Sequence, residues 1–235
     1  MKNYKKIFLS SILVLSCIIG LSFVNAPKPD LNPKLLTYCK SLPSEFNQID
    51  EETKANLIEL ANYISEQQRE KKAINLLFVC TSNSRRSHLA QVWSQIASLY
   101  YDVKMVSTFS GGTEQTKVNK NAILALEKTG IKLQSSQQSE NPIWTAIIGD
   151  EINPMVLFSK KYTDSTNPAQ NFGAIMVCSE ADKSCPNVNG ADFRLGLPYQ
   201  DPKAFDNTPQ QNEKYDERCR QIARDMFYVF SQIKQ

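Results

Sequence analysis

Histidine is almost absent from the 235-residue sequence, in which His88 is the only one. A single histidine cannot build a metal site by itself, because structural and catalytic sites draw on several His, Cys, Asp or Glu side chains. The sequence therefore gives no reason to expect a metal or another cofactor. We expect His88 to lie on the surface of a helix.

A surplus of charge is also missing once the first 26 residues are set aside. The full chain has 27 Lys and Arg residues against 24 Asp and Glu residues. Residues 1–26 hold three lysines and no acidic residue, so the remainder has 24 residues of each sign. A neutral chain has no electrostatic basis for binding nucleic acid or an anionic membrane surface. Neither is expected as a partner.

The first 26 residues have the pattern of an export signal. Three lysines precede an apolar run over residues 7–24, and small residues suited to cleavage stand at 24–26. Pro27 disfavours cleavage there, so an uncleaved membrane anchor is one alternative and a lipoprotein site at Cys17 is another. The sequence thus predicts an exported protein, periplasmic or membrane-anchored, whose only membrane contact is its N-terminal segment.

The rest of the chain has room for one α/β domain with additions. Strand-like and helix-like patterns alternate from residue 73 onward, which predicts an open parallel sheet with helices on both faces. Residues 27–72 precede it as a helical extension, in which 27–49 form a tether with one short helix. Residues 134–172 are expected to be an insertion that contains a β-hairpin. We expect strands at 76–79, 103–110 and 174–177, and helices at 51–64, 89–101, 121–129 and 212–233.

A cysteine ends the first predicted strand, and an arginine follows it in the spacing Cys-x5-Arg. Cys80 and Arg86 enclose a polar loop that runs straight into a helix, so the loop amides and the helix N-terminus point to one place. Such surroundings favour the thiolate, which is the nucleophilic form of cysteine. The planar fork of Arg86 can hold two oxygens of a tetrahedral oxyanion. The loop residues assigned to oxyanion binding are Thr81, Ser82, Asn83, Ser84, Arg85 and Ser87.

Taken singly, a strand-end cysteine and an arginine are usually a core residue and a surface residue. With Asn83 inside the loop and Ser87 directly after the arginine, however, the segment resembles the phosphate loop of the low-molecular-weight protein tyrosine phosphatases and the related thioredoxin-coupled arsenate reductases. The resemblance implies that Asn83 orders the loop and that the Ser87 hydroxyl holds the thiolate. It covers roughly residues 74–235, so we expect 73–235 to form a catalytic domain with the fold of these phosphatases.

A second strand-end cysteine is Cys178, and Cys185 follows it in a Cys-x6-Cys-Pro segment. This segment closely resembles the redox pair of the reductases. The resemblance implies that Cys178 resolves an adduct on Cys80 and that Cys185 then takes over as the disulfide partner. In an exported protein, a structural disulfide between Cys178 and Cys185 is the alternative. Cys219 is expected to be a core thiol, and its pairing with Cys39 stays open.

The sequence Asp201-Pro202 is the other landmark of the family. The resemblance makes Asp201 the general acid that protonates a leaving oxygen. Phosphatases of the family usually carry tyrosines just after this proline, whereas this chain offers only Phe205 as a substitute. The reductases usually have a glutamate on the helix after the loop, where this chain has Gln91. No cation site is therefore carried over.

Three functions compete. The favoured one is an arsenate reductase, in which Cys80 attacks arsenate and the cysteine pair passes the oxidation to a thioredoxin-like donor. The alternative is a phosphatase that acts on a phosphorylated substrate through a phosphocysteine intermediate, because phosphate and arsenate are nearly isosteric. The third is a non-catalytic oxyanion-binding module. The complete set of Cys80, Arg86 and Asp201 argues against it.

Overall fold

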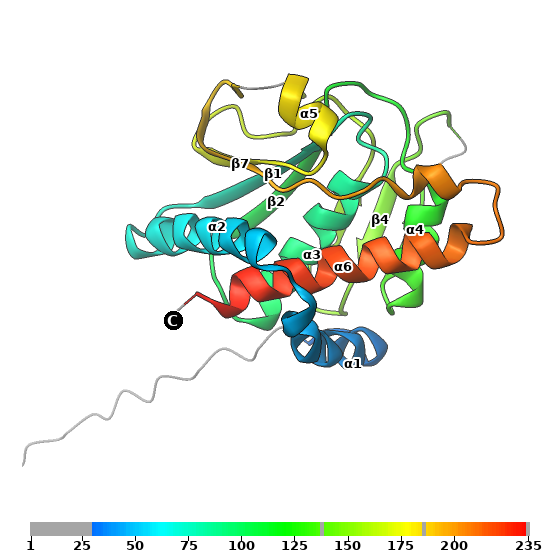
Figure 1. Cartoon of the computed structure of the whole chain (residues 1–235), viewed down its shortest axis with the longest axis horizontal. Coiled ribbons are helices and arrows are strands. Elements are labelled where there is room, and N and C mark those ends of the chain that lie inside the picture. Colours follow the sequence, from blue (N-terminus) through cyan, green and yellow to red (C-terminus); the bar gives the residue numbers. More distant parts are fainter. Residues whose placement is uncertain (1–29, 137–138, 185–186, 234–235) are drawn as a thin grey trace, which may run out of the picture.

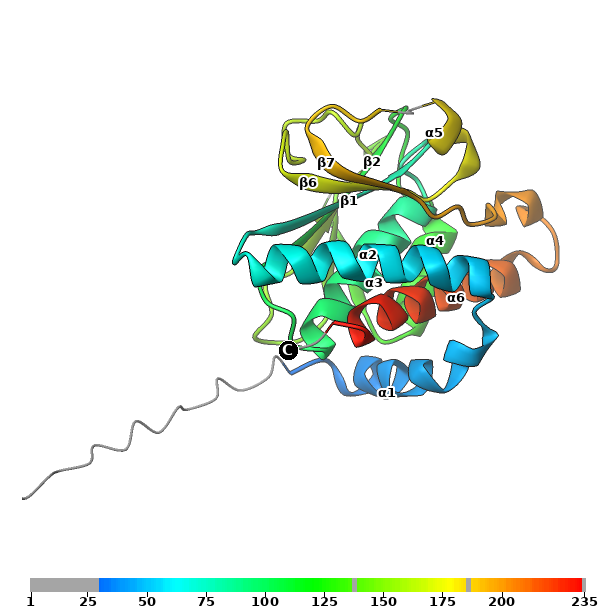
Figure 2. The same cartoon turned by 60° about the vertical axis from the view of Figure 1, so that its left-hand side comes forward.

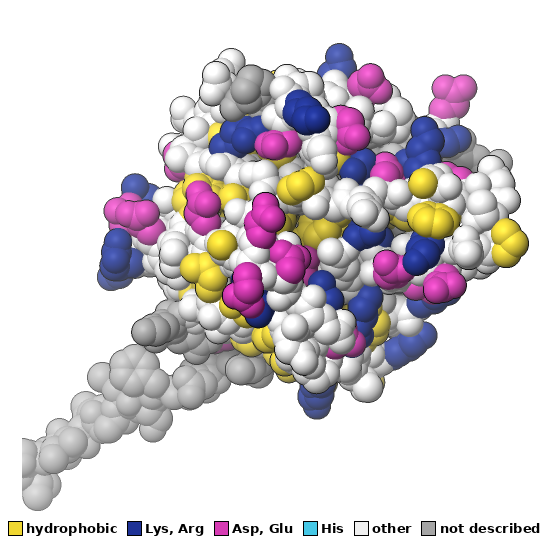
Figure 3. Space-filling view, in the orientation of Figure 1, with side chains coloured by type: hydrophobic (Ala, Val, Ile, Leu, Met, Phe, Trp, Pro, Cys, Tyr) yellow, Lys and Arg dark blue, Asp and Glu magenta, His cyan; other side chains and the backbone are white. Residues whose placement is uncertain are grey.

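The computed structural model describes residues 30–136, 139–184 and 187–233. The predicted export signal at 1–26, with Cys17, lies outside the described residues, and so does Cys185. None of the described helices is both long and apolar enough to span a membrane. Basic and acidic side chains are mixed over the face shown in Figure 3, in keeping with the balanced charge.

Four parallel strands form the central sheet, in the order β2-β1-β6-β7 (Figure 1). The middle strands are β1 (Ile74–Cys80) and β6 (Phe172–Met176), and the edges are β2 (Val106–Gly112) and β7 (Ala191–Gly196). Every residue of β6 is buried, as expected for a strand covered on both faces. The predicted open parallel sheet is confirmed.

Helices flank this sheet on both faces. In both views, α2 (Glu51–Arg69), α3 (Arg86–Tyr100) and α6 (Gln211–Ser231) lie on one side and the short α5 (Ser179–Ser184) lies on the other (Figures 1 and 2). The Cys80 loop lies between the end of β1 and the start of α3, so it stands at the carboxyl end of a central strand. Open parallel sheets place their ligands at such ends.

The predicted elements after residue 50 are confirmed within a few residues, and α4 (Lys120–Lys128) lies where a helix is expected. β2 begins three residues late because Met105 has a left-handed backbone conformation (φ 61°), which interrupts an extended strand. No pattern in the sequence predicts β7 or α5. Both are short, and neither has a periodic pattern long enough to recognise.

A second sheet is formed by three antiparallel strands, β3 (Lys132–Ser135), β4 (Trp144–Ile147) and β5 (Met155–Leu157). The pairing of β4 with β5 confirms the predicted hairpin. β3 extends it to a meander. The bounds of the extension at 27–72 and of the insertion at 134–172 stay predictions.

The segment before α2 is part of the core, so the expectation of a tether is wrong. It forms α1 (Pro33–Ser41) and the 3-10 helix η1 (Leu42–Gln48). Pro33 and Pro43 fall in the first turns of these helices, where a missing N–H costs no hydrogen bond. Its apolar side chains belong to the same buried cluster as β1; they are Leu31, Leu35, Cys39, Leu42 and Ile49.

Candidate active site

Cys80 ends β1 and is almost fully buried, with 3% of its surface exposed. Its Sγ lies 3.1 Å from Oγ of Ser87 in the first turn of α3. Asn83 Nδ2 donates to the same Ser87 oxygen at 2.9 Å, which leaves the hydroxyl proton available to the sulfur. The order Asn83 to Ser87 to Cys80 therefore directs a hydrogen bond at the sulfur, an arrangement suited to a thiolate nucleophile.

The carbonyl groups of the Cys80 loop are turned away from its centre. The C=O and the following N–H of a trans peptide point in opposite directions, so outward carbonyls leave the N–H groups facing inward. Together with the N-terminus of α3, these N–H groups make an anion-binding site. The carbonyls of residues 80 to 84 accept, in order, from Thr113 N (3.1 Å), Glu114 N (2.8 Å), Ser159 Oγ (3.1 Å), His88 Nε2 (2.9 Å) and Asn119 N (2.9 Å).

Two backbone features allow the loop to close. Asn83 adopts a left-handed conformation (φ 42°), which asparagine tolerates better than most residues, and its Oδ1 accepts from Lys160 N at 2.8 Å. Gly112 at the end of β2 packs against the loop. A Cβ at Gly112 would lie 2.6 Å from Thr81 O and 2.7 Å from Asn83 N, so a side chain there would force the loop away from β2.

His88 is completely buried, so the expectation that it lies on a helix surface is wrong. Its Nε2 lies 2.9 Å from the Asn83 carbonyl, which can only accept, so Nε2 carries the proton. Nδ1 then accepts from the Ser110 hydroxyl on β2 at 3.1 Å. Burial, together with the nearby charge of Lys160, lowers the pKa of His88 from 6.5 to about 3. The neutral ring fixes the carbonyl of Asn83 and with it the loop.

His88 and Asp225 give the stability of the protein opposite pH dependences. In the unfolded chain His88 binds a proton below pH 6.5, whereas in the folded chain it binds one only below about pH 3. The contribution of His88 to the free energy of unfolding therefore falls on acidification between these two values. Burial raises the pKa of Asp225 from 3.8 to about 6, against the opposing effect of Arg224. As the pH falls, the folded chain therefore binds the Asp225 proton before the unfolded chain does. The contribution of Asp225 to the free energy of unfolding falls as the pH rises from 3.8 to about 6.

We expect Asp225→Asn to uncover the effect of His88. Between about pH 6 and about pH 4, the free energy of unfolding of this variant should fall by up to about 1.4 kcal/mol per pH unit more than that of the wild type. In His88→Gln, the free energy of unfolding should instead rise, relative to that of the wild type, as the pH falls over the same range. Urea unfolding curves at a series of pH values measure all three proteins. Equal slopes would contradict both assignments.

Arg86 and Asp201 meet at the cavity. Arg86 Nη2 donates to Asp201 Oδ2 at 2.7 Å, and Nη1 donates to the carbonyl of Tyr199 at 2.9 Å. Asp201 also caps the short helix η2 (Pro202–Phe205), because its Oδ1 accepts from Lys203 N at 3.0 Å. Arg86 Nε is buried and has no hydrogen-bond partner among the described residues. It remains as a donor for an oxyanion.

The cavity has a volume of about 210 Å³. It brings together the predicted nucleophile, arginine and acid with four of the loop residues, whereas Asn83 and Ser87 support the loop from behind. Sequence reasoning missed Glu180 and Lys203 as cavity residues, although both are close in sequence to residues it did select. The lining consists of Cys80, Thr81, Ser82, Ser84, Arg85, Arg86, Glu180, Asp201 and Lys203.

Arg85 lines the cavity but shares its charge with other groups. Its Nε donates to the hydroxyl of Tyr215 on α6 at 2.7 Å, and its Nη2 lies 3.3 Å from Asp206 Oδ2. The Tyr215 hydroxyl in turn donates to Asp206 Oδ1 at 2.7 Å. Arg85 thus ties the catalytic loop to α6. The Ser84 hydroxyl ties the loop to the segment before α4, because it donates to the carbonyl of Lys117 at 2.7 Å.

Cys178 lies next to the loop, just beyond the end of the adjacent strand β6. Val177 N donates to Val79 O at 2.8 Å, so Cys80 and Cys178 each directly follow one residue of this hydrogen-bonded pair. Cys178 is fully buried, and its Sγ lies 3.5 Å from Oγ1 of Thr81. The structure therefore places a second thiol beside the catalytic loop.

The other described cysteines play no part in this arrangement. Cys39 and Cys219 are free thiols within the described part of the chain, so these two do not pair with each other. Cys219 is buried in the core, as predicted, and its sulfur accepts from Trp93 Nε1 at 3.3 Å. A bond to Cys185 lies outside the described residues.

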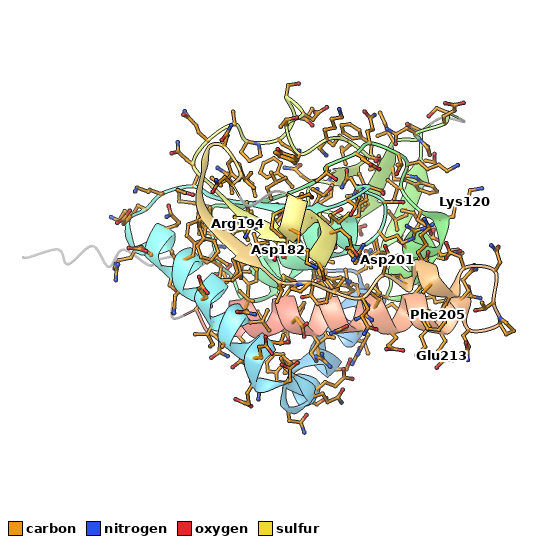
Figure 4. All side chains as sticks on the ribbon, turned by 45° about the horizontal axis from the view of Figure 1, so that its top comes forward. Lys120, Asp182, Arg194, Asp201, Phe205 and Glu213 are labelled. Atoms are coloured by element: carbon orange, nitrogen blue, oxygen red, sulfur yellow. The ribbon has the colours of Figure 1, made fainter. Side chains whose placement is uncertain are left out.

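Two further residues from the sequence analysis have structural places. Gln91 is buried, and its Nε2 donates to the carbonyl of Thr108 on β2 at 3.2 Å. Phe205 does not line the catalytic cavity; its ring lies 5.6 Å from Lys214 Nζ. In Figure 4, Phe205 and Asp201 are labelled on η2 and the loop before it. The described residues contain no cluster of three or more His, Cys, Asp or Glu suited to a metal ion.

A buried thiol that receives a directed hydrogen bond, in a cavity shared with an arginine and a carboxylate, defines a thiol-based enzyme of oxyanion chemistry. No family model matches the chain. Arsenate reductase 2 of Staphylococcus haemolyticus is 31% identical over 134 residues, which are 54% of this chain and 82% of that protein. The arsenate reductase of Brevibacillus brevis is 29% identical over 127 residues, 54% of this chain and 75% of that protein.

Among solved structures, a low-molecular-weight phosphotyrosine phosphatase from Vibrio cholerae matches with a TM-score of 0.47 and 14% identity, over 67% of this chain and 94% of that chain. The sequence relationship to the curated proteins is the stronger finding. This chain belongs to the arsenate reductase family, which confirms the resemblance shown by its motifs.

Proposed function

We propose that the protein is an arsenate reductase that works through three cysteines. The observation that carries the proposal is the position of Cys178, which is buried and next to the loop that holds Cys80. A phosphatase needs only the first of these thiols. The names of the related curated proteins support the same activity.

The first step uses the cavity. The Cys80 thiolate attacks arsenic and forms a sulfur–arsenic bond, and one arsenate oxygen leaves as water after taking up protons. Arg86 and the inward loop N–H groups hold the remaining oxygens. Cys178 then attacks the sulfur of Cys80, and the sulfur–arsenic bond breaks. Its electron pair stays on arsenic, which leaves as arsenite in the trivalent state, and a disulfide joins Cys80 to Cys178.

The last steps restore the enzyme. Cys185 attacks Cys178 and releases the thiolate of Cys80, so the oxidation moves to a disulfide between Cys178 and Cys185. A thioredoxin-like dithiol then reduces this disulfide and is itself oxidised. One arsenate consumes two electrons, and one dithiol supplies them.

A second candidate activity, phosphomonoester hydrolysis, is favoured by the position of Asp201. Its carboxyl group lines the same cavity as Cys80 and Arg86, where a general acid could protonate a leaving alcohol. The product of the first step would be a phosphocysteine, which water hydrolyses.

We expect Asp201→Asn to separate the two activities. With an alkyl phosphate, whose alcohol leaves poorly without a proton, kcat should fall by ~10²–10⁴. Arsenate reduction should lose less of its rate, because the hydroxyl oxygen that leaves arsenate already carries one proton and needs only one more to depart as water. Glu180→Gln, a second carboxylate of the cavity, serves as the matched control. Equal losses of both activities in Asp201→Asn would show that Asp201 acts mainly by holding Arg86.

The proposed function is tested with the purified, fully reduced protein, assayed with arsenate and a thioredoxin system and in parallel with p-nitrophenyl phosphate. Sustained, arsenate-dependent oxidation of thioredoxin is the expected result. Phosphate release without arsenate turnover would instead make the protein a phosphatase.

We also propose that the protein acts outside the cytoplasm, on the strength of the three lysines and the apolar run before residue 26. The reductant would then be a thioredoxin-like protein of the same compartment. Cell fractionation followed by N-terminal sequencing tests this. A full-length chain found only in the cytosol would reject the proposal.

A further inference from the structure

A second cleft adjoins the catalytic cavity. It has a volume of about 810 Å³, nearly four times the 210 Å³ of the cavity. The two share Ser82, Ser84, Arg85 and Lys203, so the catalytic loop forms one wall of each. Arsenate or phosphate alone requires the small cavity only. The large cleft is open to the remainder of a larger substrate.

The walls of this cleft are mainly basic. Lys117, Lys120 and Lys203 line it against a single carboxylate, Glu140, and all three lysines are exposed. No salt bridge involves these lysines among residues 30–136, 139–184 and 187–233. Figure 4 places Lys120 at the same end of the molecule as Asp201. These ammonium groups are available to an anion.

Trp144 adds an aromatic surface to the cleft. It belongs to β4, and its indole Nε1 is buried without a hydrogen-bond partner among the described residues. The cleft therefore offers positive charge and an aromatic wall together.

We propose that this cleft is a substrate subsite that binds a second anionic group, a phosphate or a carboxylate, on the carbon skeleton of a phosphomonoester held at Cys80. The inference rests on the second candidate activity above, phosphomonoester hydrolysis at the Cys80 site, and names the substrate class of that activity. The phosphoryl group occupies the small cavity, and the skeleton crosses the shared wall at Ser82 and Ser84. Lys117 and Lys120 then meet the distal anion.

Binding to Cys80→Ser tests the proposal without turnover. Calorimetry compares two sets of ligands with alkyl chains of the same length. The first set consists of alkyl monophosphates, and the second set carries, in addition to that phosphate, a second phosphate or a carboxylate at the other end of the chain. Above a threshold chain length, the second anion should tighten Kd by about 5-fold or more, and the gain should shrink at high salt. The double variant Lys117→Gln, Lys120→Gln in the same background should lose this gain while its Kd for the monophosphates stays unchanged.

Lys132→Gln is the matched control, because Lys132 is an exposed lysine on β3 that does not line the cleft. It should keep the full gain. Equal Kd values for singly and doubly charged ligands at every chain length would overturn the subsite, and so would a gain that survives the double variant. Failure of the proposed function is a different result, namely absence of arsenate and phosphate-ester turnover in the wild type.

Discussion

Cys80→Ser is expected to abolish arsenate reduction and phosphomonoester hydrolysis together, with a loss of at least ~10⁴-fold in kcat/KM. Both reactions start with attack by the same sulfur. The hydrogen bond from Ser87, supported by Asn83, can favour a thiolate, but a serine hydroxyl does not ionise near neutral pH. Steady-state assays with arsenate and with p-nitrophenyl phosphate measure both losses.

The matched control is Cys39→Ala, which removes a free thiol from the core far along the chain from the loop. It should keep both activities, although the stability of the protein will fall. Full turnover by Cys80→Ser in either assay would contradict the assignment of the nucleophile and with it the interpretation of the cavity.

Cys178→Ser is expected to stop arsenate reduction without stopping phosphomonoester hydrolysis. Without this thiol, the adduct on Cys80 has no resolving group, so arsenite formation should stop. Hydrolysis of p-nitrophenyl phosphate should remain near the wild-type rate, because that reaction needs only Cys80 and its cavity. Cys185→Ser should behave differently: it permits one arsenite per chain, through a disulfide between Cys80 and Cys178, and then stalls.

Quantifying arsenite per chain in both variants, with p-nitrophenyl phosphate as the parallel control, distinguishes these outcomes. Sustained arsenate reduction by Cys185→Ser at the wild-type rate would contradict the proposed transfer between the cysteines. The Cys178 and Cys185 pair would then be a structural feature.

The parts of the site that sequence predicts are those with local signatures. Cys80, Arg86 and Ser87 stand at fixed spacings after an apolar strand, so a short window contains the nucleophile, its arginine and its supporting hydroxyl. The parallel sheet follows in the same way from alternating strand and helix patterns. Cys178 is predictable because it follows the end of the neighbouring strand β6 by two residues, and neighbouring parallel strands end at one edge.

The parts that sequence misses depend on contacts between distant residues. The polarity of His88 predicts a surface position, but its burial depends on Ser110 of β2 and on the carbonyl of Asn83. Lys160, whose backbone N–H holds the Asn83 side chain, stands 77 residues further along the chain. The burial of Leu35 in the core contradicts the predicted tether, since it depends on packing against distant elements that the local sequence does not show.

One turnover without any external reductant tests the central claim most directly. Fully reduced protein is mixed with excess arsenate, arsenite and free thiols are counted, and disulfide-linked peptides are identified by mass spectrometry. The account predicts about one arsenite per chain, the loss of two thiols and a linked peptide pair that contains Cys178 and Cys185. Unchanged thiols and no arsenite, in protein that still releases phosphate from p-nitrophenyl phosphate, would contradict it.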